Sequence, residues 1–162
     1  MRELRTALDM ILNSLNLSLL SISQILNPLK LCVKMETAIT KGIKISVRAI
    51  YMPRESRPAQ YSFYHAYRIT IENLSSDTVQ LLRRHWFIVD SNGSTREVEG
   101  EGVIGQQPVL QPGQSHEYSS WCPLMTDVGK MYGTFLMKRR LDNRLFKVVV
   151  PEFKLIPPFK LN

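Results

Sequence analysis

A hydrophobic period of two, beginning near residue 41, is the feature that most limits how this chain can fold. Apolar side chains occupy every second position from Ile43 to Ala49, and residues 63–71 repeat the alternation with bulkier side chains. Such alternation is typical of a strand with one face on a core. Both segments are therefore predicted to be strands, and the polar segment 52–59, which contains two prolines, is predicted to be the loop between them.

The next strand is predicted over residues 78–89, and it runs into the strongest hairpin signal in the chain, Asp90-Ser-Asn-Gly-Ser94. A two-residue loop would place Trp86 opposite Glu99, whereas a three-residue loop over 91–93 places it opposite Val98. A slip of one residue moves every side chain of a strand to the other face of the sheet. We therefore predict the three-residue loop, because it puts Trp86 and Val98 on a common apolar face.

The remaining sequence also reads as short strands separated by turns. No helical pattern follows residue 35, and a chain of 162 residues suits one domain. Seven or eight short strands with regular turn signals predict an all-β fold, an antiparallel β-sandwich. The further predicted strands are 115–121, 131–140, 144–150 and 152–156.

The first 34 residues differ from the rest in composition and in the spacing of their apolar residues. Residues 10–29 carry no charge, but asparagine, serine and glutamine interrupt the run, which argues against a membrane span. Leucines and isoleucines from Leu8 to Leu26 recur at spacings of three and four, which is typical of an amphipathic helix. Three interpretations are open: a helix packed on the domain, a membrane-surface helix, or a non-native extension. We favour the last, a short helical or disordered extension over 1–34 before a domain over 35–162.

Charge and cysteine content exclude several classes of protein. The chain has 21 lysines and arginines against 14 acidic residues, a formal charge of +7. This excess favours weak attraction to phosphates or acidic partners, yet no DNA recognition motif accompanies it. Cys32 and Cys122 lack the spacing of a zinc site, and two lone thiols fit a reducing, cytoplasmic location.

Five motifs follow one another in a specific order, and together they resemble the ApaG family. The likeness extends from about residue 40 to the end, and Trp121 stands where that family commonly has a small residue. The motifs are Arg84-His85-Trp86-x-Ile88, the segment 97–108 (Glu-Val-Glu-Gly-Glu-Gly-Val-Ile-Gly-Gln-Gln-Pro), Leu110-x-Pro112-Gly113, Gly129-x-Met131-x-Gly133 and Pro151-x-Phe153.

The resemblance implies an immunoglobulin-like or fibronectin type III-like sandwich, in agreement with the strand count. It also implies an association with Co²⁺ and Mg²⁺ efflux, without a settled biochemical activity. Similar domains occur as modules of larger eukaryotic proteins, where they look like protein-interaction units. A sandwich of this kind does not itself span a membrane, so a role in efflux is expected to be indirect.

Residues 100–105 match the spacing G-x-G-x-x-G. Pro108 and Pro112 exclude the helix that a dinucleotide fingerprint requires after the last glycine. A glycine-rich loop can still turn backbone amides toward an anion, and basic residues of the neighbouring strand could add charge. The alternative is a structural loop whose glycines adopt unusual backbone angles. The candidate anion or nucleotide site comprises Arg83, Arg84, His85, Gly100, Gly102, Gly105 and Gln107.

The acidic residues at 97, 99 and 101 project from one face of a strand. With His85 opposite Glu99, the set His85, Glu99 and Glu101 is a weak candidate for a hard divalent cation such as Mg²⁺, or for Co²⁺. The favoured alternative is cross-strand ion pairing of Arg83 with Glu101 and of His85 with Glu99. We therefore expect no resident metal or cofactor.

The sequence contains no paired nucleophile and base, so we expect a binding domain rather than an enzyme. Cys122 would be a reactive thiol only if a positive neighbour lowered its pKa. An unidentified protein is the partner that we expect, and a homodimer is a further option. The alternative function is binding of a nucleotide or pyrophosphate at residues 100–107.

Overall fold

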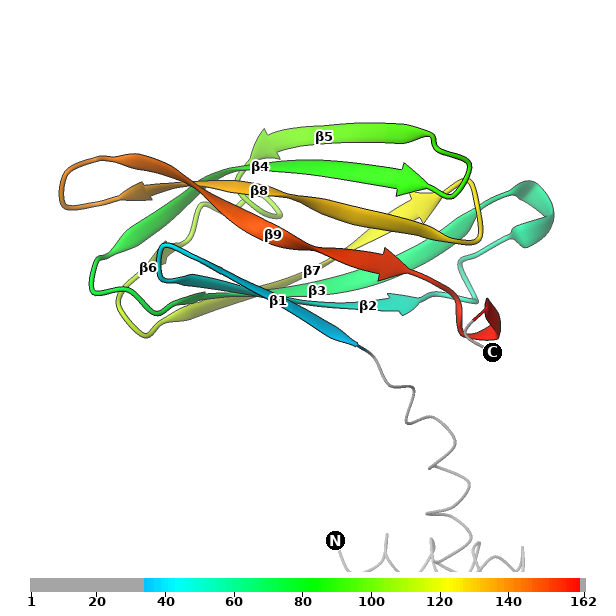
Figure 1. The fold of residues 1–162 in the computed structure, drawn as a ribbon, viewed down its shortest axis with the longest axis horizontal. Helices are drawn as coiled ribbons and strands as arrows, with labels where there is room; N and C mark the ends of the chain where they lie inside the picture. Colours follow the sequence, from blue (N-terminus) through cyan, green and yellow to red (C-terminus); the bar gives the residue numbers. More distant parts are fainter. Residues whose placement is uncertain (1–33, 161–162) are drawn as a thin grey trace, which may run out of the picture. The chain divides into compact units, whose positions relative to one another are not determined.

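The computed structural model describes residues 34–160, and it shows two antiparallel sheets stacked face to face (Figure 1). One sheet has the strand order β1-β2-β3-β7, and the other has the order β5-β4-β8-β9, with the short β6 also paired to β4. The predicted all-β sandwich is confirmed. The strands are β1 (Met35–Thr40), β2 (Ile43–Tyr51), β3 (Phe63–Asn73), β4 (Val79–Asp90), β5 (Thr95–Glu101), β6 (Val109–Leu110), β7 (Ser115–Leu124), β8 (Gly129–Arg139) and β9 (Leu145–Leu155).

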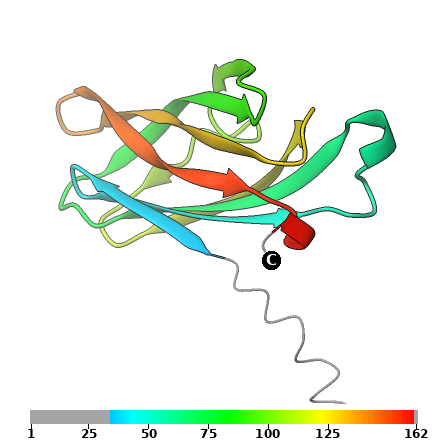
Figure 2. The same cartoon turned by 45° about the vertical axis from the view of Figure 1, so that its right-hand side comes forward.

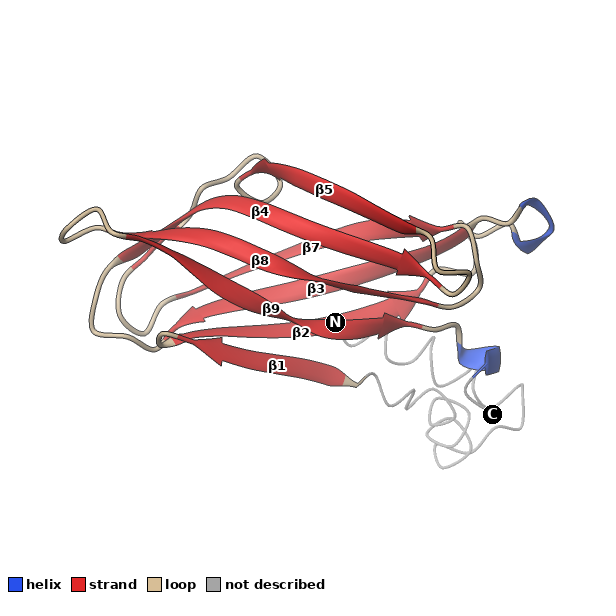
Figure 3. Cartoon of the chain, turned by 45° about the horizontal axis from the view of Figure 1, so that its top comes forward, coloured by secondary structure: helices blue, strands red, loops and turns tan. Residues whose placement is uncertain are grey.

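Helical structure within residues 34–160 is limited to two 3₁₀ turns, Pro58–Gln60 and Pro158–Lys160, at the margins of the sandwich (Figure 3). Neither turn is long and apolar enough to cross a membrane. The extension predicted over residues 1–34 falls almost wholly outside the described residues. It therefore stays a prediction.

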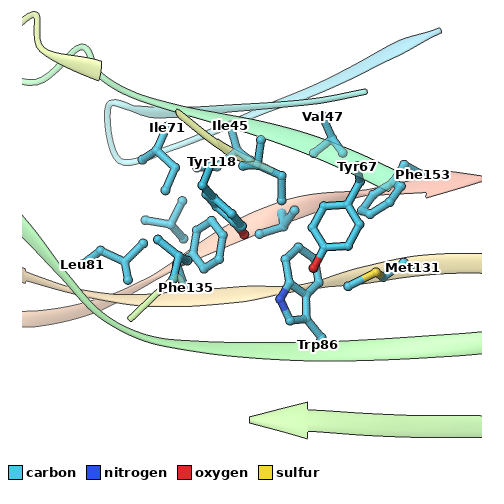
Figure 4. Packing of buried hydrophobic residues seen from close by; sticks show 14 of the residues in the cluster. Ile45, Val47, Tyr67, Ile71, Leu81, Trp86, Tyr118, Met131, Phe135 and Phe153 are labelled. Atoms are coloured by element: carbon cyan, nitrogen blue, oxygen red, sulfur yellow. The ribbon is translucent and has the colours of Figure 1, made fainter. Parts of the chain in front are cut away.

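The apolar residues that alternate in the sequence form the core, as predicted. Ile43, Ile45 and Val47 of β2 are buried, and the alternate residues of β3 from Phe63 to Ile71 lie beside them on the same face. Tyr67 of this set contacts Trp86 of the other sheet, with ring centroids 5.9 Å apart (Figure 4). Phe135 and Phe153 pack edge-on against the same indole, so Trp86 occupies the centre of the interface between the sheets.

The β4–β5 hairpin has the predicted register. Trp86 pairs with Val98 across the three-residue loop 91–93, and Gly93 adopts a positive φ of 88°. Trp86 and Val98 therefore lie on the same face, as predicted, but the other sheet covers only Trp86, because Val98 is 41% exposed while Trp86 is buried. β5 is an edge strand, and every residue of it except Gly100 is exposed. Correct pairing at a sheet edge does not guarantee that another layer covers the side chain.

The two strands that were predicted near the C-terminus form one continuous strand, β9. Residues 144–150 and 152–156 are predicted as separate strands because Pro151 lies between them, yet β9 continues through it. The pairing of β8 with β9 shifts register between Met131 and Gly133, which leaves an irregularity opposite the proline. A proline lacks an amide hydrogen and is tolerated in strands at such positions.

Directional hydrogen bonds connect the two layers at both ends of β4. Before β4, the buried Asn73 of β3 donates from Nδ2 to the carbonyl of Leu110 in β6 at 3.0 Å. At the end of β4, the buried Asp90 accepts from the amides of Met125 and Thr126, which follow β7, at 2.8 and 3.0 Å. The guanidinium of Arg96 in β5 also donates to the carbonyl of Pro123 in β7. A buried polar group without such partners would be destabilising.

Candidate functional site

The predicted acidic cluster lies on the outer face of the β5-β4-β8-β9 sheet. His85 Nε2 is 2.9 Å from Glu97 Oε2, and its Nδ1 is 3.3 Å from Glu99 Oε1. The predicted pair of His85 with Glu99 is present, but Arg83 pairs with Glu99 at 3.8 Å and not with the predicted Glu101, its backbone partner. The side chains thus pair partly on the diagonal, because long side chains reach past their direct neighbours. All of these carboxylates are exposed, so the pairs stabilise the fold weakly.

This cluster does not form a preformed metal site. The second carboxylate at His85 belongs to Glu97, and Glu101 makes no contact with the imidazole. Among residues 34–160, no three histidine, cysteine or acidic side chains are arranged to hold a metal ion. The Mg²⁺ or Co²⁺ hypothesis therefore stays a prediction that this part of the chain does not support with a ligand set.

The glycine-rich segment is a small hairpin of its own. Val103 and Gln106 exchange two backbone hydrogen bonds, of 2.8 and 3.0 Å. The central residues Ile104 and Gly105 both have positive φ, 47° and 70°, which a type I′ turn requires. The last glycine of the motif thus supplies the second left-handed position of this turn. The prediction of unusual backbone angles in this segment is confirmed.

Gly102 is required by both conformation and space. Its φ is 56°, and a Cβ built on it would lie 2.1 Å from the carbonyl oxygen of Gln106. Its amide donates to the carbonyl of Leu82 in β4 at 2.8 Å. Any side chain at this position would force apart the two arms of the small hairpin.

Arg84 and Gln107 attach the same loop to β4. Arg84 Nη1 donates to the carbonyls of Glu101 and Gly102 at 2.9 and 2.8 Å, and its guanidinium lies over Gly100. Gln107 Nε2 donates to the carbonyl of Leu82 at 2.9 Å. These two candidate ligand-binding side chains are therefore engaged in holding the loop.

The geometry leaves few groups with which this loop could bind an anion. The amides of Gly102, Val103 and Gln106 donate to carbonyls of the fold, as described above, and Ile104 and Gly105 supply the amides at the tip of the turn. A hollow beside Arg83, His85 and Lys147 has a volume of about 120 Å³. Pockets for drug-sized ligands span roughly 300–1,000 Å³, so this hollow is small for a nucleotide.

Burial sets the protonation state of two titratable side chains in the core, Cys122 and His65. The Cys122 side chain points into the core, and burial raises the pKa of its thiol to about 11, which keeps it protonated at neutral pH. His65 is 1% exposed, and burial lowers the pKa of its imidazole to about 4, although the backbone at Phe63 opposes part of this shift. Cys32 lies outside the described residues.

The structure also reveals a surface that the sequence reading did not identify. On the outer face of the β1-β2-β3-β7 sheet, Ile50, Ala66 and Trp121 are direct neighbours across β2, β3 and β7. Trp121 is 59% exposed and Ile50 is 52% exposed. Tyr64 packs beside the indole, with ring centroids 5.5 Å apart. We call these four residues, Ile50, Tyr64, Ala66 and Trp121, the aromatic patch.

Part of this surface could have been found from the sequence. Tyr118, Cys122 and Leu124 have the parity of a buried face in β7, so Trp121 must point outward. A tryptophan that points into solvent is unusual, because large apolar side chains are mostly buried. The other residues of the patch belong to β2 and β3, and the sequence of β7 alone does not show which of their residues lie beside Trp121.

Two arginines lie directly beside the aromatic patch. Arg48 of β2 and Arg68 of β3 are direct cross-strand partners. Arg68 lies 3.6 Å from the Glu117 carboxylate, and both of these side chains are more than half exposed. Within residues 34–160, Arg48 makes no ion pair. The patch and the two arginines together combine aromatic, aliphatic and cationic groups on one open surface.

Comparison with known proteins identifies the relatives of the chain. The family model of the ApaG domain matches residues 53–139. The chain is 46% identical over 124 residues to Protein ApaG of Brucella canis, and the match covers 76% of this chain and 95% of the relative. It is 43% identical over 128 residues to Protein ApaG of Anaeromyxobacter dehalogenans, with coverage of 79% and 100%.

Solved structures agree with this result. The crystal structure of an ApaA protein from Bordetella pertussis superposes with a TM-score of 0.70 at 40% identity, over 72% of this chain and 94% of that one. A second X-ray structure, a structural-genomics target, gives a TM-score of 0.71 at 34% identity, with coverage of 77% and 94%. The resemblance inferred from the five ordered motifs is confirmed, and this chain belongs to the ApaG family.

Proposed function

We propose that this chain is a non-enzymatic protein-binding module and that it binds its partner through the aromatic patch. The single observation that carries the proposal is the exposed row of Ile50, Ala66 and Trp121 beside two arginines. Tryptophan, tyrosine and arginine are the residues that dominate binding energy at protein interfaces. A binding role without catalysis is also supported by the protonated, buried thiol of Cys122 and the buried imidazole of His65.

The test compares the proteins captured by tagged wild-type chain and by a Trp121→Ser variant. Mass spectrometry is expected to identify a protein that the wild type retains and the variant loses. The matched control is Val149→Ser, because Val149 is a half-exposed apolar residue on the outer face of the opposite sheet. The captured protein is then purified and its affinity for all three chains is measured. If no partner depends on Trp121, the patch is not the binding surface.

The likeness to ApaG proteins further supports an indirect role in Co²⁺ and Mg²⁺ homeostasis, exerted through the bound partner. A strain that lacks the corresponding gene is expected to regain wild-type Co²⁺ tolerance with the wild-type chain and with Val149→Ser, but not with Trp121→Ser. Equal rescue by all three chains would mean that Co²⁺ tolerance does not require the aromatic patch.

The alternative is a nucleotide or pyrophosphate at residues 100–107. The tip amides of Ile104 and Gly105 are its remaining support, since the other amides described above donate within the fold. A ligand at 100 times its Kd raises the free energy of unfolding by about 2.7 kcal/mol. Thermal shift with ATP, diadenosine polyphosphates and pyrophosphate therefore tests this alternative, and unchanged melting temperatures would contradict it.

A further inference from the structure

The cross-strand pair of Arg48 and Arg68 is unfavourable by itself. Like charges directly opposite each other in an antiparallel pair destabilise a sheet. The nearby carboxylate of Glu117 is 3.6 Å from Arg68, and it also accepts a hydrogen bond from Thr70 at 3.3 Å. One acidic group thus partly compensates one of two arginines. As far as residues 34–160 show, the outer face keeps an uncompensated positive charge at Arg48, next to exposed apolar side chains.

The surface is hollowed on both sides of the arginine pair. A hollow of about 230 Å³ is lined by Ile50, Ala66, Ser119 and the two arginines, with Tyr67 also contributing, and its floor is low because Ala66 and Ser119 have small side chains. A second hollow of about 210 Å³ shares Arg48 and Arg68 and is otherwise more polar. The first hollow suits an apolar side chain, and the arginines between the hollows suit a carboxylate.

We propose that the partner presents an acidic-apolar segment to this surface, in which an apolar side chain sits over Ala66 and a neighbouring carboxylate lies between Arg48 and Arg68. This inference rests on the proposed function and names the chemistry of the partner. Arginine binds carboxylates through paired N–H donors, and the partner's charge would remove the repulsion within the arginine pair. An aliphatic rim at Ile50 and the acidic Glu117 at the margin favour a peptide over a nucleic acid backbone.

The experiment selects short random peptides from a displayed library against the full chain. Enriched peptides are synthesised and their affinities are measured by fluorescence anisotropy. We expect an aliphatic or aromatic residue close to an aspartate or glutamate in the enriched sequences. The variant Arg48→Glu is expected to weaken their binding by about tenfold or more, because it replaces attraction with repulsion. Lys147→Glu, an equal charge change on the opposite outer face, is the matched control and should leave binding unchanged.

The stability of two variants distinguishes loss of binding from loss of the fold. Arg48→Glu converts a repulsive pair into an attractive one with Arg68, so its melting temperature is expected to be equal to or higher than that of the wild type. Ala66→Phe fills the hollow, while an aromatic side chain suits a strand. This second variant is expected to lose peptide binding and to retain the wild-type circular dichroism spectrum.

Several results would overturn the inference. Failure to enrich any peptide would do so, as would peptides that lack acidic residues or that bind Arg48→Glu and the wild type equally. Binding of single-stranded RNA at this face, with a steep dependence on salt, would assign it to another class of partner. A captured partner that depends on Trp121 but not on Arg48 would leave the proposed function intact while contradicting this inference.

Discussion

His65 makes the stability of the domain depend on pH, in a direction that the structure defines. Its imidazole is 1% exposed, and neither ring nitrogen makes a hydrogen bond of normal geometry within residues 34–160. Burial lowers its pKa from 6.5 to about 4. Above pH 6.5, the histidine is neutral in both the folded and the unfolded chain, and its contribution to folding is then at its most favourable.

As the pH falls from 6.5 toward 4, the unfolded chain binds a proton that the folded chain does not. The free energy of unfolding therefore decreases through this window, and the loss is complete once the folded state is protonated as well. The difference between the two pKa values corresponds to about 3 kcal/mol when fully developed, and to about 2 kcal/mol near pH 5. A loss of this size is a large fraction of the roughly 5–15 kcal/mol that stabilises a typical domain.

The assay is urea unfolding of the wild type and of His65→Leu, near neutral pH and near pH 5, followed by tryptophan fluorescence, which changes on unfolding because Trp86 is buried in the folded state. We expect the wild type to lose about 2 kcal/mol more than the variant on acidification. Ile69→Val in the same strand is the control, because it changes a buried side chain without changing a titrating group. Equal acid sensitivity of the wild type and His65→Leu would refute the reasoning.

Three further substitutions test other parts of the structure. Gly102→Val is expected to lower the free energy of unfolding by about 2 kcal/mol or more, because the new Cβ would meet the carbonyl of Gln106, and chemical denaturation measures this loss. Asp90→Ala leaves the amides of Met125 and Thr126 without their acceptor, and a loss of about 1–3 kcal/mol in the same assay is expected, whereas an unchanged midpoint would contradict it. Arg48→Glu is expected to stabilise the domain by up to about 1 kcal/mol in low salt, an effect that high salt should reduce.

Local patterns account for what could be predicted of the fold. The alternation in β2 and β3 and the three-residue loop at 91–93 involve neighbours in sequence, and both are confirmed. The sequence reading missed β1 because its apolar residues Met35 and Ile39 point outward at a sheet edge. It divided β9 at Pro151 because the irregular pairing with β8 that admits a proline depends on a distant strand.

The candidate site was harder to predict because it, too, depends on contacts between residues that are far apart in the sequence. The glycine spacing at 100–105 is visible in the sequence, but its cause is the contact of Gly102 with Gln106 and the attachment of Arg84 to the loop. These are properties of a three-dimensional arrangement. The aromatic patch combines three strands, and only the outward position of Trp121 is visible within one of them.

Figure 2 shows the two sheets of the sandwich as ribbons. The hydrogen bonds of Asn73 and Asp90 have a consequence for how these sheets are aligned. The hydrophobic effect itself has little directional preference, so apolar burial alone restricts rotation of one layer against the other less than directional bonds do. Bonds at both ends of β4 select a single alignment, because any rotation would strip buried polar atoms of their partners. Two small polar side chains thereby help to determine the mutual orientation of two whole sheets, together with the bond from Arg96 and the close packing around Trp86.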